Sequence, residues 1–197
     1  MGHAGMAAAA VRYLRTGPAR PVEALPRPEL RCVGEDERAP VEQAEFRRVL
    51  GNFASGVTVV TSPATDGESD PAGFACQSFS SLSLDPPLVA FMVGRASTTW
   101  PRIARAGAFC VNVLAAGQGA LCRGFAVSGG DKFAGVAYDT APVSGSPRLT
   151  GALAWIDCTI HAVHTGGDHL IVVGRVADLG TADTDEAPLL FHQGRFL

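Results

Sequence analysis

Short apolar runs, separated by small polar residues and by turn-forming glycines and prolines, dominate the chain after residue 40. Runs of this length and spacing predict strands, because β-branched and apolar residues fit a pleated, half-buried surface. The expected strands lie at 57–61, 73–83 (one or two strands), 88–93, 108–114, 152–164 and 168–179, with a short closing segment at 189–197. About six to eight strands are expected, and Thr165-Gly166-Gly167 is the expected turn between the two longest.

Helical spacing is confined to short segments. The expected helices lie at 42–52, 97–106 and 118–125. In the middle one, Ser97 is suited to the N-cap, Pro101 to the first turn and Gly107 to the end. Residues 131–146 are expected to be irregular. Because the strands follow one another without alternating helices, the pattern predicts a mainly β, antiparallel barrel with a few short peripheral helices.

The first forty residues differ from the rest of the chain. Prolines at 18, 21, 26, 28 and 40 interrupt both helices and strands there. The apolar stretch 6–11 precedes Arg12 and Arg15, which is the reverse of the order in a secretory signal. We expect residues 1–40 to be a disordered or poorly ordered extension, with an upstream start-site error as the alternative, and residues 41–197 to form one domain.

Composition and charge narrow the function classes. The net charge of −3, without a basic patch, gives no reason to expect a nucleic-acid partner. The apolar runs are far too short to span a membrane. The cysteines are odd in number and form no C-x-x-C pair; they are Cys32, Cys76, Cys110, Cys122 and Cys158. Buried thiols in the reducing cytoplasm are therefore expected, rather than disulfides or a zinc site.

Several common catalytic and binding signatures are absent from the sequence, among them the P-loop, zinc-protease and serine-hydrolase motifs. Gly117 and Gly119 follow an expected strand, but Cys122 stands where a dinucleotide fingerprint needs its third glycine. An ordinary turn explains these glycines better. His161 and His164 lie three apart on an expected strand, so their side chains point to opposite faces and no metal site is expected.

One candidate site is the segment from Gly73 to Val89, which is unusually poor in large and charged side chains. Its small or uncharged residues are Ala75, Gln77, Ser78, Ser80 and Ser81. A strand of this kind lets a flat ligand approach the backbone and offers hydrogen bonds to the edge of a heteroaromatic ring. A serine-rich edge strand explains the same residues equally well.

A second candidate is Arg95–Arg102, where Ser97, Thr98 and Thr99 precede an expected helix. Free N–H groups at a helix start favour an anion such as phosphate. Simple capping by Ser97 is the alternative, and it explains one of the three hydroxyls. A third candidate is the Gly166–His169 turn, where His169 either adds turn polarity or lies over a pocket and holds a nicotinamide.

Taken in order, these segments resemble the short-chain flavin reductase family, and within it the reductase components of two-component flavin-dependent monooxygenases. The resemblance runs from Phe46 to Leu197. The segments that carry it are 46–61, 78–87, 109–114, 131–133, 167–169 and 194–196. Each segment alone is modestly specific, whereas their order along the chain makes the set strongly specific.

The resemblance implies an FMN-binding split β-barrel with a Greek-key core, and a homodimer that holds the flavin at the subunit interface. It implies FMN or FAD as the flavin, NADH or NADPH as the hydride donor, and a separate monooxygenase that receives reduced flavin. His169 is the implied nicotinamide contact and the candidate catalytic residue. The other implied cofactor-binding residues are Ala75, Cys76, Gln77, Ser78, Phe79, Ser97, Thr98, Thr99, Lys132, Phe133, Gly167 and Asp168.

The sequence departs from the family pattern at one point. Relatives often read Thr-Ala-Asn-Ser where this chain reads Ala75-Cys76-Gln77-Ser78, so one hydroxyl is lost and one amide is longer. Two alternatives to a reductase stay open. One is another split-barrel enzyme, either a flavoprotein oxidase with a fixed flavin or a deazaflavin-dependent enzyme. The other is a non-enzymatic flavin-binding module.

Overall fold

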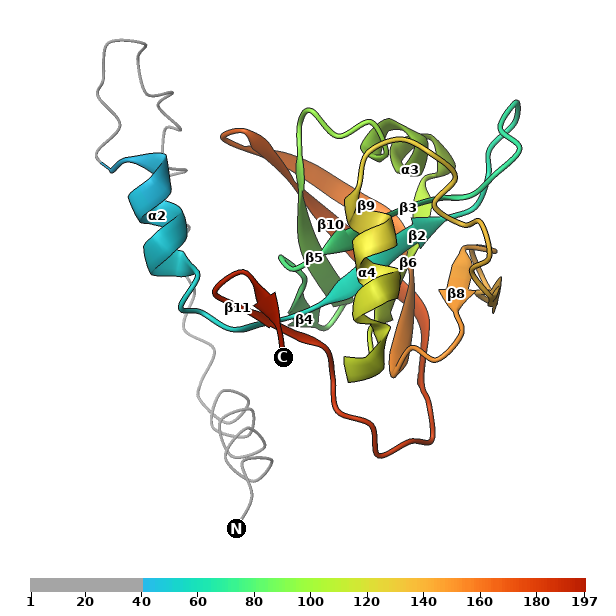
Figure 1. Cartoon of the computed structure of the whole chain (residues 1–197). Coiled ribbons are helices and arrows are strands. Elements are labelled where there is room, and N and C mark those ends of the chain that lie inside the picture. The colour runs from blue at the N-terminus through green and yellow to red at the C-terminus, as the bar shows by residue number, and fades with distance from the viewer. Residues whose placement is uncertain (1–40) are drawn as a thin grey trace, which may run out of the picture. The chain divides into compact units, whose positions relative to one another are not determined.

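The computed structural model describes residues 41–197, so the extension expected over residues 1–40 lies outside the described residues. A seven-stranded antiparallel sheet forms the centre of the domain, in the order β3-β2-β6-β9-β10-β5-β4 (Figure 1). Its strands are β2 (Thr58–Ser62), β3 (Ala72–Cys76), β4 (Ser80–Leu84), β5 (Pro87–Gly94), β6 (Ala108–Val113), β9 (Ala154–Gly166) and β10 (His169–Thr181). The mainly β fold predicted from the strand spacing is confirmed.

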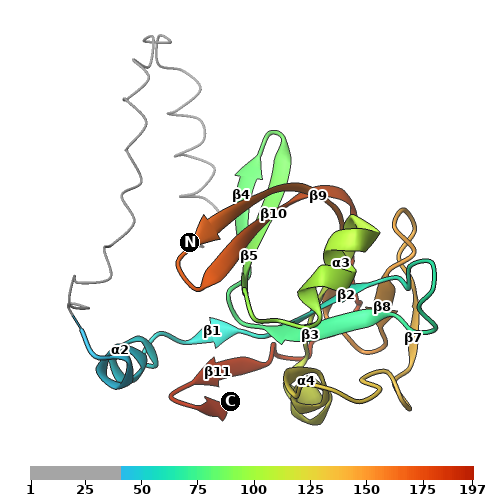
Figure 2. The ribbon, with the colours of Figure 1, turned by 90° about the horizontal axis from the view of Figure 1, so that it is seen from above.

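The sheet curls so that β3 and β5 approach each other (Figure 2). The β2–β3 ladder ends where Thr58 pairs with Cys76, and the next strand begins at Ser80. Between them, the Ser78 hydroxyl donates to the Met92 carbonyl and accepts from the Met92 N–H, both at 3.0 Å. A side chain therefore takes the place of a backbone ladder at this seam, and the backbone of residues 77–79 stays outside strand pairing.

Smaller elements surround the barrel. The short strands are β1 (Ser55–Gly56), β11 (Leu190–His192) and β12 (Arg195–Phe196), which form one sheet, and β7 (Tyr138–Thr140) and β8 (Pro147–Leu149), which form another. The helices are α2 (Gln43–Leu50), α3 (Trp100–Ala106), the 3-10 turn η1 (Ala116–Gln118) and α4 (Gly119–Ala126).

Two hydrophobic clusters lie on opposite faces of β2, as strand alternation requires. Val60 belongs to the cluster inside the barrel, where the rings of Phe91 and Phe109 pack edge to face with centroids 5.1 Å apart. Val59 belongs to the other cluster, which lies beneath α4. A Cβ at Gly174 would lie 2.4 Å from the Phe109 ring, so close packing inside the barrel demands a glycine there.

Some local expectations were wrong. The described chain has twelve strands rather than six to eight, because 131–146, expected to be irregular, contributes β7 and the short elements were missed. Helix α3 begins at Trp100 and not at Ser97; the Ser97 hydroxyl accepts a hydrogen bond from the Trp100 N–H at 3.2 Å. The β9–β10 turn falls at Gly167-Asp168, because β9 continues to Gly166 and β10 begins only at His169.

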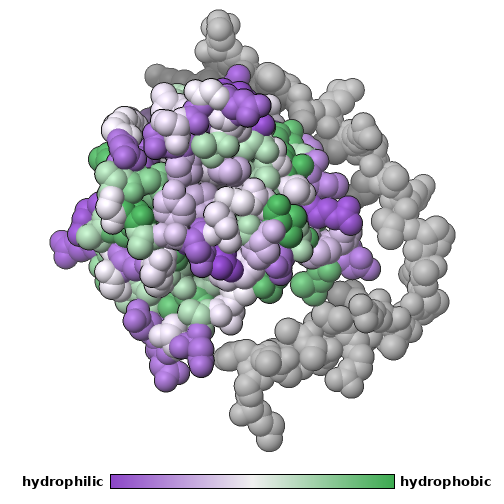
Figure 3. Space-filling view, turned by 90° about the vertical axis from the view of Figure 1, so that its right-hand side faces the viewer, coloured by the Kyte–Doolittle hydropathy of each residue, from purple (hydrophilic) through white to green (hydrophobic). Residues whose placement is uncertain are grey.

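Helix α2 buries none of its residues. Phe46, Val49, Leu50 and the following Phe53 are all exposed, and Phe53 is 80% exposed. The face of the molecule shown in Figure 3 instead scatters its hydrophobic residues among hydrophilic ones. The apolar side of α2 is therefore an unusual concentration of exposed hydrophobic surface.

The expected burial of the cysteine thiols is confirmed for the cysteines among residues 41–197. Cys76, Cys110, Cys122 and Cys158 are free and buried, and burial raises the pKa of Cys110 and of Cys158 to about 12. His161 lies at a bulge in β9. Within residues 41–197, no three His, Cys, Asp or Glu side chains are grouped as a metal site. None of the helices there is both long and apolar enough to cross a membrane.

Candidate active site

A hollow of about 610 Å³ opens at the end of β3. Its walls come from segments distant in sequence: the ends of β3 and β5, the turn before α3, the end of α4, the start of β10, and the C-terminal strands. The site residues expected from the sequence that line it are Ala75, Cys76, Gln77, Ser78, Ser97, Thr98, Thr99, Lys132 and His169. Among the described residues that line it, none carries a carboxylate.

The end of β3 presents mainly backbone and small side chains to the hollow. Cys76 is only 4% exposed, and its side chain belongs to the core inside the barrel. Burial raises the pKa of the Cys76 thiol, so the thiol stays protonated near neutral pH and is no nucleophile. The Thr58 hydroxyl donates to the Cys76 carbonyl at 2.9 Å and anchors the strand end. Beyond it, residues 77–79 leave the ladder and offer peptide groups to a ligand.

The turn 97–99 divides its hydroxyls between two tasks. Ser97 uses its hydroxyl to accept from the Trp100 N–H, so the capping explanation is correct for this residue. Thr98 and Thr99 line the hollow. Helix α3 has only seven residues, so its N-terminus is a weak anion site. The hydroxyls of Thr98 and Thr99 are therefore the stronger hydrogen-bonding groups for an anion in this wall.

Lys132 supplies a positive charge beside those threonines. Its ammonium donates to the carbonyls of Gly73 and Phe125, both at 3.2 Å, which holds the side chain in the wall. Burial lowers the pKa of Lys132, because desolvation disfavours the charged form. Phe133, expected beside it in the site, is instead 9% exposed and packs edge to face on Phe125 with ring centroids 5.0 Å apart.

His169 also lines the hollow, at the start of β10 and beside the end of β5 that leads into the turn 97–99. It pairs with Gly94 of β5, and a Cβ on Gly94 would lie 4.0 Å from His169 Nε2. His169 Nδ1 lies 2.7 Å from an Asp168 carboxylate oxygen, and this hydrogen bond lowers the pKa of Asp168. Asp168 and Gly167, which has φ +66°, form the turn and do not line the hollow. Asp168 is therefore placed to orient the imidazole.

Comparison with known proteins decides the family. The model of the flavin reductase like domain matches residues 50–197. The chain belongs to this family. A reductase subunit of a flavin-dependent monooxygenase from Rhodococcus jostii is 48% identical over 156 residues, covering 79% of this chain and 77% of the relative.

Two further relatives are similar over most of the chain. An NADH-dependent FAD reductase from Streptomyces globisporus is 40% identical over 161 residues, covering 80% of this chain and 86% of the relative. The crystal structure of a nitrilotriacetate monooxygenase component B homologue from Mycobacterium thermoresistibile has a TM-score of 0.74 and 46% identity, covering 79% of this chain and 85% of that one. The split-barrel fold expected from the resemblance is confirmed.

The hollow of this flavin reductase family member fits a flavin. Its volume lies within the range of small-molecule sites. Part of its lining is the backbone of residues 77 and 78, which lies outside strand pairing and suits the hydrogen-bonding edge of a flat ring. Thr98, Thr99 and Lys132 also line it, and these side chains suit a phosphate.

Some lining residues carry no signal in the sequence. They are Val57, Phe74, Met92, Val93, Gly94, Ala96, Cys122, Phe125, Ala126, Val127, Ser128, Phe191 and Phe196. They come from separate parts of the chain, and packing alone brings them together. Val57 and Phe196 belong to segments that carry the family resemblance, and these segments were the available hints. Phe79, expected in the site, packs against the barrel core and does not line the hollow.

Proposed function

We propose that this protein is an NADH-dependent flavin reductase that transfers a hydride from the nicotinamide to FMN or FAD and supplies reduced flavin to a separate monooxygenase. The observation that carries the proposal is the hollow at the end of β3, whose lining combines residues 77 and 78, outside the strand ladder, with Thr98, Thr99 and Lys132. The Rhodococcus and Streptomyces relatives support the partner and the hydride donor respectively. NADPH is the alternative donor.

Each wall of the hollow has its own task in this proposal. The segment Ala75–Phe79 holds the ring and ribityl chain, with Cys76 acting through its backbone and Phe79 through the packing beneath. Thr98, Thr99 and Lys132 hold the phosphate, while Ser97 and Phe133 support these groups from behind. His169 seats the nicotinamide, oriented by Asp168 in the turn that Gly167 permits.

The chemistry needs little from the side chains. Bound nicotinamide and flavin themselves supply the hydride donor and acceptor, so the hydride step needs no protein acid or base. The chain orients the two molecules and limits water in the hollow. The absence of a carboxylate among the described residues lining the hollow agrees with this division of labour.

The proposed assembly is a cytoplasmic homodimer with the flavin near the subunit interface. The exposed apolar side chains of Phe46, Val49, Leu50 and Phe53 support it, because a monomer rarely leaves so many together in water. Four buried free cysteines support a reducing compartment. Light scattering during size-exclusion chromatography tests the assembly, and a monomeric mass at working concentration contradicts it.

We propose that residues 41–197 form the catalytic domain; the family match begins within this range, at residue 50. The decisive assay follows the absorbance of reduced nicotinamide, with FMN and FAD each tested against NADH and NADPH. Steady oxidation that depends on added flavin supports the reductase. A tightly bound flavin that ignores both nicotinamides supports the oxidase or deazaflavin alternative, and flavin binding without any turnover supports a binding module.

A further inference from the structure

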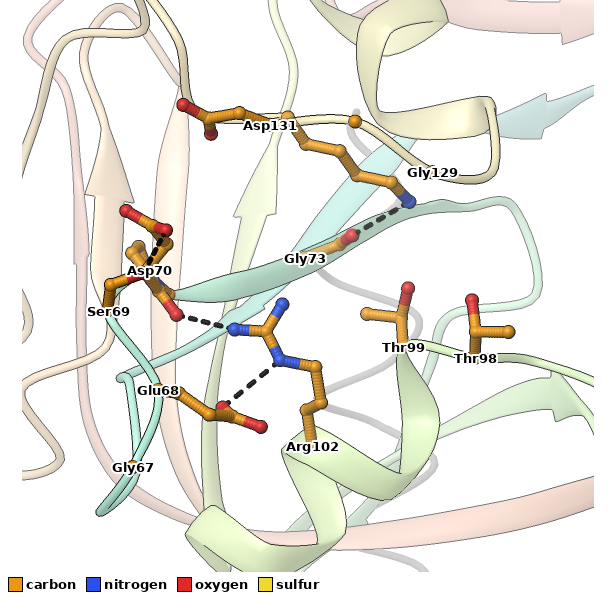
Figure 4. Close-up of a pocket in the computed structure, with 13 residues that line it drawn as sticks. Gly67, Glu68, Ser69, Asp70, Gly73, Thr98, Thr99, Arg102, Gly129 and Asp131 are labelled. Atoms are coloured by element: carbon orange, nitrogen blue, oxygen red, sulfur yellow. Dashed lines mark hydrogen bonds and ion pairs between the residues drawn. The ribbon is translucent and has the colours of Figure 1, made fainter.

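A second hollow, of about 540 Å³, lies beyond the threonine and lysine end of the first (Figure 4). The loop 67–71 between β2 and β3 forms one wall, the start of α3 forms another, and the glycine-containing loop 129–132 after α4 forms the third. In Figure 4, Arg102 projects from α3 between Glu68 and Asp70 on one side and Thr99 on the other.

The two hollows share part of their lining. Thr98, Thr99 and Lys132 line both of them. These are the residues proposed to hold the flavin phosphate, so a phosphate bound there lies at the junction. A ligand that continues beyond this phosphate has room to enter the second hollow, whereas a ligand that ends at the phosphate leaves the second hollow to water.

The wall of the second hollow is held in place by ion pairs. Glu68 accepts from Arg105 at 2.6 Å and lies 3.1 Å from the Arg102 Nε. Arg102 also donates to the backbone carbonyl of Asp70 at 2.5 Å. The loop 67–71 is therefore tied to α3, and the hollow does not depend on a ligand to form it.

The chemistry of this hollow differs from that of the first. Carboxylates of Asp70 and Asp131 line it, and carboxylates are the groups that accept hydrogen bonds from ribose hydroxyls. One oxygen of Asp70 accepts from Ser69 and one of Asp131 accepts from the Phe133 N–H, which leaves each group its other oxygen. Gly129 and Gly130 present backbone without side chains, over which a flat base can lie. Arg102 and Lys132 supply positive charge for a diphosphate.

We propose that the second hollow binds the adenosine monophosphate half of FAD, so that this chain prefers FAD to FMN. The inference rests on the proposed function, because it takes the flavin phosphate to lie at Thr98, Thr99 and Lys132. The carboxylates then act in two directions: they bind the ribose of FAD, and they disfavour the dianionic terminal phosphate of FMN by like-charge repulsion.

Fluorescence titration of the full chain with riboflavin, FMN and FAD tests the preference. We expect FAD to bind about tenfold more tightly than FMN, the gain of one or two hydrogen bonds to charged groups. The double variant Asp70→Asn with Asp131→Asn should weaken FAD binding by about tenfold and should strengthen FMN binding, because the like-charge repulsion on the terminal phosphate is removed. Asp66→Asn, in the same loop but outside the lining, is the matched control and should change neither.

A bulky substitution in the second hollow tests the same preference independently. Ser69→Trp places a bulky ring in the wall of the second hollow and should weaken FAD binding while sparing FMN; Ala64→Trp, outside the lining, controls for bulk. Equal affinities for FMN and FAD in the unaltered chain overturn the inference, as do variants that weaken both flavins alike. Failure to bind any flavin, riboflavin included, instead overturns the proposed function itself.

Discussion

The two sides of the main hollow are built differently. On the proposed flavin side, Thr58 anchors the carbonyl at the end of β3, Ser78 joins this segment to β5, and two backbone carbonyls hold Lys132. On the proposed nicotinamide side, His169 is exposed at the tip of a long hairpin, and its hydrogen-bond partner Asp168 is exposed as well. A rigid wall suits a ligand that binds with little rearrangement, and an open wall suits one that enters and leaves in each cycle.

The largest expected effect follows from removing the positive charge on the rigid side of the hollow. Lys132→Met removes the cation beside Thr98 and Thr99 and should weaken FMN and FAD binding by about 30-fold, the value of a charged hydrogen bond. Riboflavin has no phosphate, so its affinity should stay unchanged, and Lys132→Arg should retain most of the flavin nucleotide affinity. Equal losses for riboflavin and FMN would show that Lys132 shapes the wall and does not bind the phosphate.

The same lysine predicts a pH dependence. Burial lowers the pKa of Lys132, and a lysine loses its charge as the pH rises through its pKa. FMN affinity should therefore fall with rising pH before the ordinary lysine range is reached, while riboflavin affinity stays flat. Titrations across the alkaline range measure the difference, and parallel curves for the two flavins contradict it.

The next effect follows from removing the hydrogen bonds by which Ser78 joins the end of β3 to β5. Ser78→Ala leaves the N–H and carbonyl of Met92 without the hydroxyl and should lower the free energy of unfolding by about 1–3 kcal/mol. Flavin affinity should fall with it, because residues 77–79 lose their attachment to β5. Ser78→Thr retains a hydroxyl and is the matched control in urea denaturation. A stability unchanged by the alanine would show that other packing closes the seam.

A substitution on the open side of the hollow should change the kinetics with NADH and leave flavin affinity unchanged. His169→Ala should lower kcat/KM for NADH by about tenfold, the loss of one hydrogen-bonding contact to the nicotinamide. The flavin dissociation constant should stay unchanged, because no anchor of the flavin side involves this residue. A loss of flavin affinity of the same size would place His169 against the flavin.

The smallest effect concerns the orientation of the imidazole. Asp168→Asn weakens the bond to His169 Nδ1 and should lower kcat/KM for NADH by about threefold, less than the loss of the ring itself. The hydrogen bond lowers the pKa of Asp168, so in the unaltered chain the pair persists at neutral pH and is lost as the pH falls through that lowered pKa. An acid limb of the NADH profile that survives in the asparagine variant contradicts this role.

Local sequence carries much of the site. The small residues from Ala75 to Ser78 indicate a wall of accessible backbone, and the hydroxyls of Thr98 and Thr99 indicate a polar end. Both do line the hollow. Phe133 does not line the hollow: sequence order suggests that it accompanies Lys132, whereas its ring packs on Phe125. Residues that are adjacent in the sequence can therefore have side chains in different surroundings, one in a site and the other in the core.

The sequence by itself determined the mainly β class, most strand positions and the residue types at both ends of the hollow, because periodicity and turn chemistry act over a few residues. Only the tertiary structure decided that Ser78 meets Met92, that Gly73 and Phe125 hold Lys132, and that a second hollow continues from the first. Such contacts join residues far apart along the chain. They depend on how far the whole sheet curls, which no single segment specifies.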